Sequence, residues 1–191
     1  MKLIDKILLI PATLICLWPI GAVWGKAGAK IPFHLKQNPE ASPMNPTLLS
    51  ETVETLLFEA SNQERAKNKG VPFQAFQSEA ILVRAARDHS RDMLRRNYLS
   101  HFSPEKKSVV DRVKKYQPQL RRSLGENLHT ITSAQGLTDP PAIVTQMMED
   151  WMHSPSHRKN ILSKDYKFLG VGCASTKQTI FCTQVFGGPQ N

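Results

Sequence analysis

An uncharged stretch near the N-terminus decides how much of this chain is left to fold, and in which compartment it folds. Residues 7–24 follow a short basic start and contain no charged side chain. A basic start, an apolar stretch and then small residues are the layout of a secretory signal. Ala27 and Ala29 place small side chains at the −3 and −1 positions of a cleavage after residue 29. The sequence therefore predicts that residues 1–29 are a signal peptide and that the remaining chain is secreted or periplasmic.

Two other interpretations of this stretch remain open. Its 18 residues are close to the shortest length that spans a bilayer as a helix, so it could be retained as a membrane anchor. Pro11 and Pro19 disfavour one continuous helix. Cys16 would allow lipidation, although residues 13–15 are a poor lead-in to a lipidated cysteine. Each interpretation places the following domain outside the cytoplasm.

A proline-rich lead-in separates this stretch from the domain. Residues 30–46 contain four prolines, a composition typical of an extended tether or of a segment that packs on the domain. From residue 47 to residue 191 apolar residues recur in periodic patterns. That length suits one domain with one hydrophobic core.

Four helices are predicted where apolar residues recur at helical spacing. They are expected over residues 47–67, from a cap at Ser78 to near Met93, from a cap at Ser108 to near Tyr116, and from a cap at Asp139 to the residues before Pro155. Serine and aspartate begin helices because their side-chain oxygens accept hydrogen bonds from the free N–H groups of the first turn. Asp111, three residues after Ser108, completes a capping box.

Three strands are expected over residues 124–131, 168–174 and 179–186, and the last two form a hairpin that turns at residues 177–178. If Thr176 pairs with Thr179, then Cys173 lies opposite Cys182 in a non-hydrogen-bonded pair. The Cα atoms of such a pair are about 4.5 Å apart, which a disulfide can bridge. Oxidation is permitted outside the cytoplasm. The sequence therefore predicts a Cys173–Cys182 disulfide.

The chain is basic, with a formal net charge of +9, and it stays basic when residues 1–29 are left out. This charge favours weak attraction to anionic surfaces such as cell-envelope polymers or lipid headgroups. Nucleic acid is not an expected partner. The basic residues are scattered, and no stacking aromatic residues are interleaved with them.

Three short stretches stand out by their order and context. They read SHFSP at residues 100–104, GENL at 125–128 and WMHSPSHRKNIL at 151–162. Together they resemble the bacterial branch of the CAP superfamily, also called the SCP or PR1-like domain, over roughly residues 50–187. The resemblance implies an α+β fold, a three-layer α-β-α sandwich with a small antiparallel sheet between helical layers. The predicted order of helices and strands agrees with that fold.

The resemblance also implies a cleft with two histidines and two acidic residues, sometimes with a divalent metal. His101 and His157 match the histidines, and Glu126 matches the first acid. Ser154 stands where the second acid is usually found. His101, His157 and Glu126 could be three ligands of an open zinc site. Without metal, Glu126 would hold an adjacent histidine charged and oriented.

Plainer roles are also open to the same residues and their neighbours. Glu126 could tie down loop backbone, and His157 could satisfy a buried carbonyl. His89 shares a helix face with apolar residues and is expected in the core. Arg112 is expected to pair with a local acid, and His129 could lean toward the cleft.

We therefore expect an exported CAP-domain protein that binds a small amphipathic or lipid-like ligand, a divalent metal or a cell-envelope component in this cleft. Binding is expected rather than catalysis, and no catalytic residue is assigned. Two alternatives remain: a metal-assisted hydrolase that uses His101, His157 and Glu126, and a non-catalytic structural protein of the envelope.

Overall fold

The structure, a computed structural model, describes residues 44–68 and 74–190. The predicted signal peptide and most of the proline-rich lead-in lie outside these residues. In the described part the helices are α1 (Pro46–Lys67), α2 (Ala80–Arg96), α3 (Val109–Lys114), α4 (Pro140–His153) and α5 (Pro155–Leu162), and the strands are β1 (Gln77–Ser78), β2 (Leu124–Thr132), β3 (Phe168–Ser175) and β4 (Thr179–Gly187). None of these helices is long and apolar enough to cross a bilayer.

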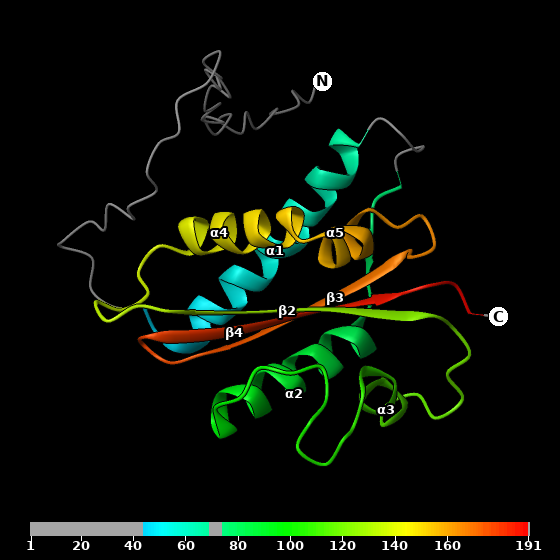
Figure 1. Ribbon diagram of the computed structural model, residues 1–191, viewed down its shortest axis with the longest axis horizontal. Helices are drawn as coiled ribbons and strands as arrows, with labels where there is room; N and C mark the ends of the chain where they lie inside the picture. Colours follow the sequence, from blue (N-terminus) through cyan, green and yellow to red (C-terminus); the bar gives the residue numbers. More distant parts are fainter. Residues whose placement is uncertain (1–43, 69–73, 191) are drawn as a thin grey trace, which may run out of the picture. The chain divides into compact units, whose positions relative to one another are not determined.

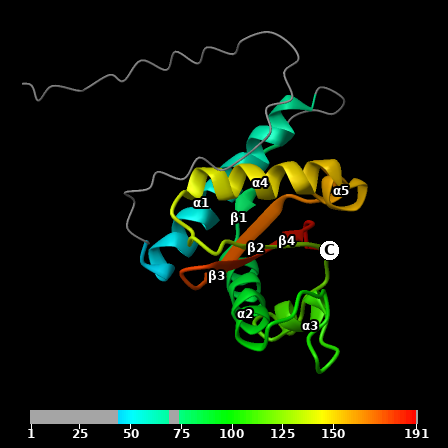
Figure 2. The ribbon, with the colours of Figure 1, turned by 60° about the vertical axis from the view of Figure 1, so that its left-hand side comes forward.

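The four strands form one sheet in the order β1-β3-β4-β2, which leaves β2 at an edge. β2, β3 and β4 pair antiparallel, and the two-residue β1 adds a short parallel pair beside β3. Helices α1, α4 and α5 cover one face of the sheet, and α2 and α3 cover the other (Figure 1). The turned view shows the same three layers (Figure 2). The predicted α+β sandwich is confirmed, with β1 as a strand that the sequence pattern was too short to reveal.

The main core lies between the sheet and the α1–α4 layer, where Trp151 and Phe186 are fully buried. On the other face α2 lies directly on β3, because two glycines of that strand present no side chain there. A Cβ atom at Gly170 would lie 2.2 Å from the backbone of Leu82, and one at Gly172 would lie 2.1 Å from the backbone of Arg87. These glycines therefore set how closely α2 approaches the sheet.

The predicted helix starts are confirmed at two places and wrong at a third. Ser108 and Asp111 form the capping box of α3, and Asp139 accepts a hydrogen bond from the N–H group of Ala142 at 3.1 Å at the start of α4. Ser78 does not cap α2: it lies in β1, and Glu79 occupies the N-cap position without a side-chain capping bond. Ser78 pairs with Leu169 of β3, so α2 begins at Ala80 and Ser78 lies one residue before the N-cap, which a local capping rule does not take into account.

Pro155 does not simply end the preceding helix, as the sequence pattern indicated. Helix α4 ends at His153, and Pro155 is the first residue of α5. Proline is accepted in the first turn of a helix because its missing N–H group has no partner there in any case. The same residue therefore separates two helices that follow one another directly.

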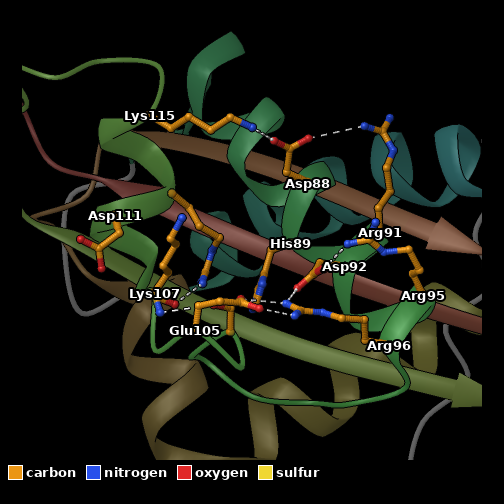
Figure 3. A pocket seen from close by; sticks show the side chains of 12 residues that line it. Asp88, His89, Arg91, Asp92, Arg95, Arg96, Glu105, Lys107, Asp111 and Lys115 are labelled. Atoms are coloured by element: carbon orange, nitrogen blue, oxygen red, sulfur yellow. Dashed lines mark hydrogen bonds and ion pairs between the residues drawn. The ribbon is translucent and has the colours of Figure 1, made fainter.

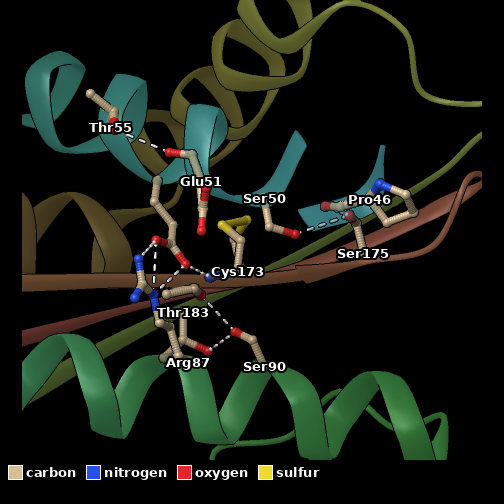
Figure 4. The surroundings of a disulfide bond; sticks show 12 residues. Pro46, Ser50, Glu51, Thr55, Arg87, Ser90, Cys173, Ser175 and Thr183 are labelled. Atoms are coloured by element: carbon tan, nitrogen blue, oxygen red, sulfur yellow. Dashed lines mark hydrogen bonds and ion pairs between the residues drawn. A yellow bond between two sulfur atoms is a disulfide. The ribbon is translucent and has the colours of Figure 1, made fainter. Parts of the chain in front are cut away.

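The predicted hairpin register and disulfide are confirmed. The N–H group of Thr176 donates to the carbonyl of Thr179 at 2.8 Å, and Cys173 pairs with Cys182. Their sulfur atoms are bonded, and their Cα atoms are 4.2 Å apart. The disulfide lies between Ser50 of α1 and Arg87 of α2 (Figure 4).

Candidate functional site

The edge strand β2 carries the GENL motif, and side chains from α4 and α5 cover its open edge. The Trp151 indole N–H donates to the carbonyl of Leu128 at 3.0 Å, and the Asn160 amide donates to the carbonyl of Glu126 at 3.2 Å. An uncovered edge would expose these carbonyls to pairing with another chain. Trp151 and Asn160, two residues of the WMHSPSHRKNIL stretch, therefore fasten α4 and α5 to β2.

Glu126 is the buried centre of the site, with a side chain only 3% exposed. One carboxylate oxygen accepts a hydrogen bond from His101 Nδ1 at 2.8 Å, and the other accepts from Arg112 Nη2. Because Nδ1 of His101 carries the donated proton, Nε2 is the ring nitrogen left for an external partner. The His101 side chain is 52% exposed. The predicted orientation of a histidine by Glu126 is thus confirmed.

Arg112 is the second partner of Glu126, and it also holds the loop that carries His101. Its guanidinium donates to the carbonyl of His101 at 3.2 Å and to the carbonyl of Lys107 at 2.9 Å. The prediction that Arg112 pairs with an acid is confirmed, but the prediction that this acid is local is wrong. The acid is Glu126, which comes from a different element, and the sequence did not indicate it because no local spacing connects the two.

Buried His89 fixes the start of the same loop. Its ring is 1% exposed, and its Nε2 lies 2.9 Å from the carbonyl of Ser100, to which it donates. Burial lowers the pKa of His89, with a further contribution from the positive charge of Arg112, so the ring is neutral. His89 is the predicted core histidine, and it positions the residue directly before His101.

His157 lies on α5, on the other side of the sheet edge. Its backbone carbonyl accepts a hydrogen bond from the Asn127 amide at 3.2 Å, and the Asn127 side-chain oxygen accepts from Asn160 at 2.9 Å. Burial lowers the pKa of the His157 ring, and the nearby charges of His101 and His129 lower it further. The imidazole of His157 is therefore neutral and makes no hydrogen bond with the described residues.

The strand geometry explains why the motif residues divide into two groups. Successive side chains of a strand point to opposite faces. Glu126 therefore meets α3, whereas Asn127 meets α5. His101 belongs to the first group and His157 to the second, although the charge of His101 still lowers the pKa of the His157 ring.

This division bears on the predicted zinc site. Both oxygens of Glu126 are engaged by protein partners, so a metal would have to compete with His101 and Arg112 for this carboxylate. Within the described ranges no three His, Cys, Asp or Glu side chains are grouped so that they could hold a metal ion. Two imidazoles remain as donors, and the three-ligand site with His101, His157 and Glu126 stays a prediction.

The remaining candidates take local partners. Ser154 lies between α4 and α5, and its hydroxyl is 3.2 Å from that of Ser156. His129 Nε2 lies 2.8 Å from the carboxylate of Asp150, and its ring meets Trp151 edge-on. Asp150 is not among the residues that the sequence motifs identified. The alternation of β2 could have indicated it, because Asn127 and His129 face the same helical layer.

A separate hollow of about 750 Å³ opens beside α2, α3 and the loop between them (Figure 3). We call it the α2–α3 hollow. Its lining is almost entirely charged, with six arginine and lysine side chains and four carboxylates among the described residues. His101, Glu126 and His157 do not line it, but it adjoins the motif site, because His89 and Arg112, which hold the His101 loop, are part of its lining.

Comparisons with known proteins agree with the fold and the motifs. The model of the cysteine-rich secretory protein family, CAP, matches residues 58–186. The uncharacterized protein YkwD of Bacillus subtilis (strain 168) is 34% identical over 119 residues, which are 62% of this chain and 41% of YkwD. The uncharacterized membrane protein YlbC of the same organism is 39% identical over 84 residues, which are 44% of this chain and 21% of YlbC. The chain thus spans less than half the length of these relatives.

Two solved structures share the fold. An extracellular protein containing an SCP domain from Bacillus anthracis is 25% identical, with a TM-score of 0.59, over 78% of this chain and 45% of that protein. An outer surface protein from Borrelia burgdorferi is 14% identical, with a TM-score of 0.61, over 78% of this chain and 99% of that protein. Since the family model also covers more than half of the sequence, this chain belongs to the cysteine-rich secretory protein (CAP) family.

Proposed function

We propose that this chain is an exported CAP-domain protein that acts by binding a small amphipathic ligand at His101 and His157. The observation that carries the proposal is the double engagement of buried Glu126 by His101 and Arg112. A carboxylate held in this way orients a histidine and is not itself free to act as a base. What remains available to a ligand is Nε2 of His101 and the neutral ring of His157.

The apolar part of such a ligand would contact the loop around His101. Leu99 is 51% exposed and Phe102 is 58% exposed, so two large apolar side chains flank the histidine in the sequence. Exposed apolar residues beside convergent polar groups are typical of ligand sites. A ligand with a polar head and an apolar tail satisfies both kinds of group.

The test is a thermal-shift titration of the chain with dodecanoate, a simple amphipathic probe. A ligand that binds only the folded state raises Tm with its concentration. We expect this rise in the wild type and its loss in the His101→Ala/Glu126→Gln variant. His153→Ala is the control, because His153 is exposed on α4 and bonds only to its own helix. Equal shifts in all three proteins would refute the assignment.

Export itself has its own test. N-terminal sequencing of the protein recovered from the culture medium or the periplasm should begin at Lys30. Recovery of the chain with residue 1 intact in the membrane fraction would support the anchor instead.

A metal is the second candidate ligand, favoured by one observation. A metal-binding histidine usually has its other ring nitrogen on a carboxylate, as His101 does with Glu126. Titration with zinc should then show stoichiometric binding that is lost in His101→Ala and in His157→Ala. Such a result would support the metal-assisted hydrolase, and turnover would need separate proof. If neither zinc nor an amphiphile binds, a structural role in the envelope is the better interpretation.

A further inference from the structure

The α2–α3 hollow has a layered charge distribution. The rim carries Arg91, Arg95 and Lys115, whose side chains are 66%, 77% and 64% exposed. Their carboxylate partners lie deeper, since Asp88 is 36% exposed and Asp92 is 20% exposed. Figure 3 shows Lys115 and Arg91 on opposite sides of Asp88, each joined to its carboxylate. At Asp88 and Asp92 the cations therefore face the solvent and the carboxylates lie beneath them, whereas Glu105 is more exposed than its partner Arg96, at 55% against 30%.

The carboxylates of the hollow are ionised at neutral pH. Burial alone would raise the pKa of Asp92, but hydrogen bonds from Arg96, Tyr98 and Arg95 outweigh it and bring the pKa to about 2. A hydrogen bond from Arg96 is the main cause that lowers the pKa of Glu105 to about 2. The hollow thus offers fixed charges of both signs, with an excess of cations.

Not every polar group in the hollow has a protein partner. The Lys107 ammonium takes part in no ion pair with the described residues, although its backbone carbonyl accepts from Arg112. Deeper down, Nδ1 of His89 and Nε of Arg112 are buried without a protein partner in the described part of the chain. His89 Nδ1 is an acceptor, because Nε2 carries the proton that is donated to Ser100.

This lining selects a ligand by its chemistry. A compound with anionic groups alone would pair with the cations but would offer no hydrogen-bond donor to Asp88, Asp92, Glu105 and Asp111, which also line the hollow. A compound with hydroxyl groups alone would leave the cations without partners. Hydroxyls that donate to the carboxylates, together with phosphates or carboxylates that accept from arginine and lysine, match the whole lining.

Other anionic partners fit less well. No tryptophan, tyrosine or phenylalanine among the described residues lines the hollow, so the bases of a nucleic acid would find no stacking surface. The exposed apolar residues Leu99, Phe102 and Val110 lie outside the lining, so nothing in it would enter a bilayer. A volume of about 750 Å³ suits a small molecule or a short segment of a polymer.

We propose that the α2–α3 hollow binds a segment of an anionic polyol polymer, with phosphate or carboxylate groups on its arginine and lysine rim and hydroxyl groups on its carboxylates. This site adjoins the motif site through His89 and Arg112, but His101 and His157 are not in its lining, and it does not depend on the ligand proposed there. It assigns the attraction of this basic chain for anionic polymers to one specific site.

The test is isothermal titration calorimetry of the full chain with poly(glycerol phosphate), which carries phosphates and hydroxyls on one soluble chain. The Arg91→Gln/Arg95→Gln variant removes two rim charges and keeps good helix formers in α2. Arg158→Gln/Lys159→Gln removes the same charge from exposed positions of α5, in the opposite layer. We expect the rim variant to lose about tenfold or more in affinity, and the α5 variant to stay within about twofold of the wild type.

Equal losses in the two variants would overturn the proposal, because they would mean attraction by net charge alone. Three further probes test which groups of the ligand are recognised. Inorganic polyphosphate has charge without hydroxyls, and dextran has hydroxyls without charge. If either binds as tightly as poly(glycerol phosphate) or more tightly, the proposal is also overturned. Vesicles of phosphatidylglycerol present the same headgroup chemistry on a membrane, and binding to these alone would refute a polymer ligand. His101→Ala should bind poly(glycerol phosphate) like the wild type, which separates this site from the motif site.

Discussion

The Arg112–Glu126 pair provides the sharpest test of how the site is built. Both side chains are almost fully buried, with exposed fractions of 10% and 3%. Arg112→Leu would remove the guanidinium and leave a buried carboxylate that only His101 still contacts. Breaking a buried ion pair from one side costs about 3–5 kcal/mol, and the remaining His101 hydrogen bond places the expected loss near 3 kcal/mol. At a urea dependence of about 2 kcal/mol per molar, the unfolding midpoint should fall by about 1.5 M.

A double-mutant cycle identifies the source of that loss. In Glu126→Gln/Arg112→Leu no uncompensated charge is buried, so the double variant should be more stable than Arg112→Leu by about 1–2 kcal/mol. Arg95→Leu is the matched control on exposed α2 surface, and its effect should stay within about 0.5 kcal/mol. Urea unfolding followed by circular dichroism measures the wild type, Arg112→Leu, Glu126→Gln, the double variant and the control. The pair does not hold the site together as its contacts indicate if Arg112→Leu lowers the free energy of unfolding by less than about 1 kcal/mol. The same follows if the losses of the two single variants simply add in the double variant.

Three further predictions concern protonation, packing and oxidation. Burial lowers the pKa of His89 and His157 in the folded chain. At a pH below the ordinary pKa of histidine, the unfolded chain therefore binds more protons than the folded chain. The free energy of unfolding should therefore fall as pH drops below about 6.5, by at most about 1.4 kcal/mol per pH unit for each histidine. In His89→Gln the urea midpoint should depend less steeply on pH than in the wild type. Gly172→Ala places a Cβ 2.1 Å from the backbone of α2 and should lower the free energy of unfolding by about 3 kcal/mol. Thermal denaturation measures this loss, and an unchanged Tm would mean that α2 does not lie so close to β3. Replacing Cys173 and Cys182 by serine should cost about 2–3 kcal/mol, and mass spectrometry of the exported wild type should find neither thiol free.

Local patterns predicted the parts of this fold that depend on neighbours in the sequence. The capping box at Ser108 and the start of α4 after Asp139 follow from groups within one helical turn. The Cys173–Cys182 register follows from counting outward from a two-residue turn. The same kind of local rule failed at Ser78, where pairing with a distant strand overrides the capping preference.

The motifs also indicated which residues gather at β2, and the resemblance that they carry named the family. Sequence alone thus determined the α+β fold and the cysteine pair, and it identified His101, Glu126 and His157 as candidate site residues. Only the tertiary structure decided how these residues are shared between the two faces of the sheet. It also assigned Arg112 to Glu126 and Asp150 to His129, and it gathered the charges of the α2–α3 hollow. The physical reason is that such contacts join segments far apart in the chain, and their geometry is set by how closely helices and sheet pack.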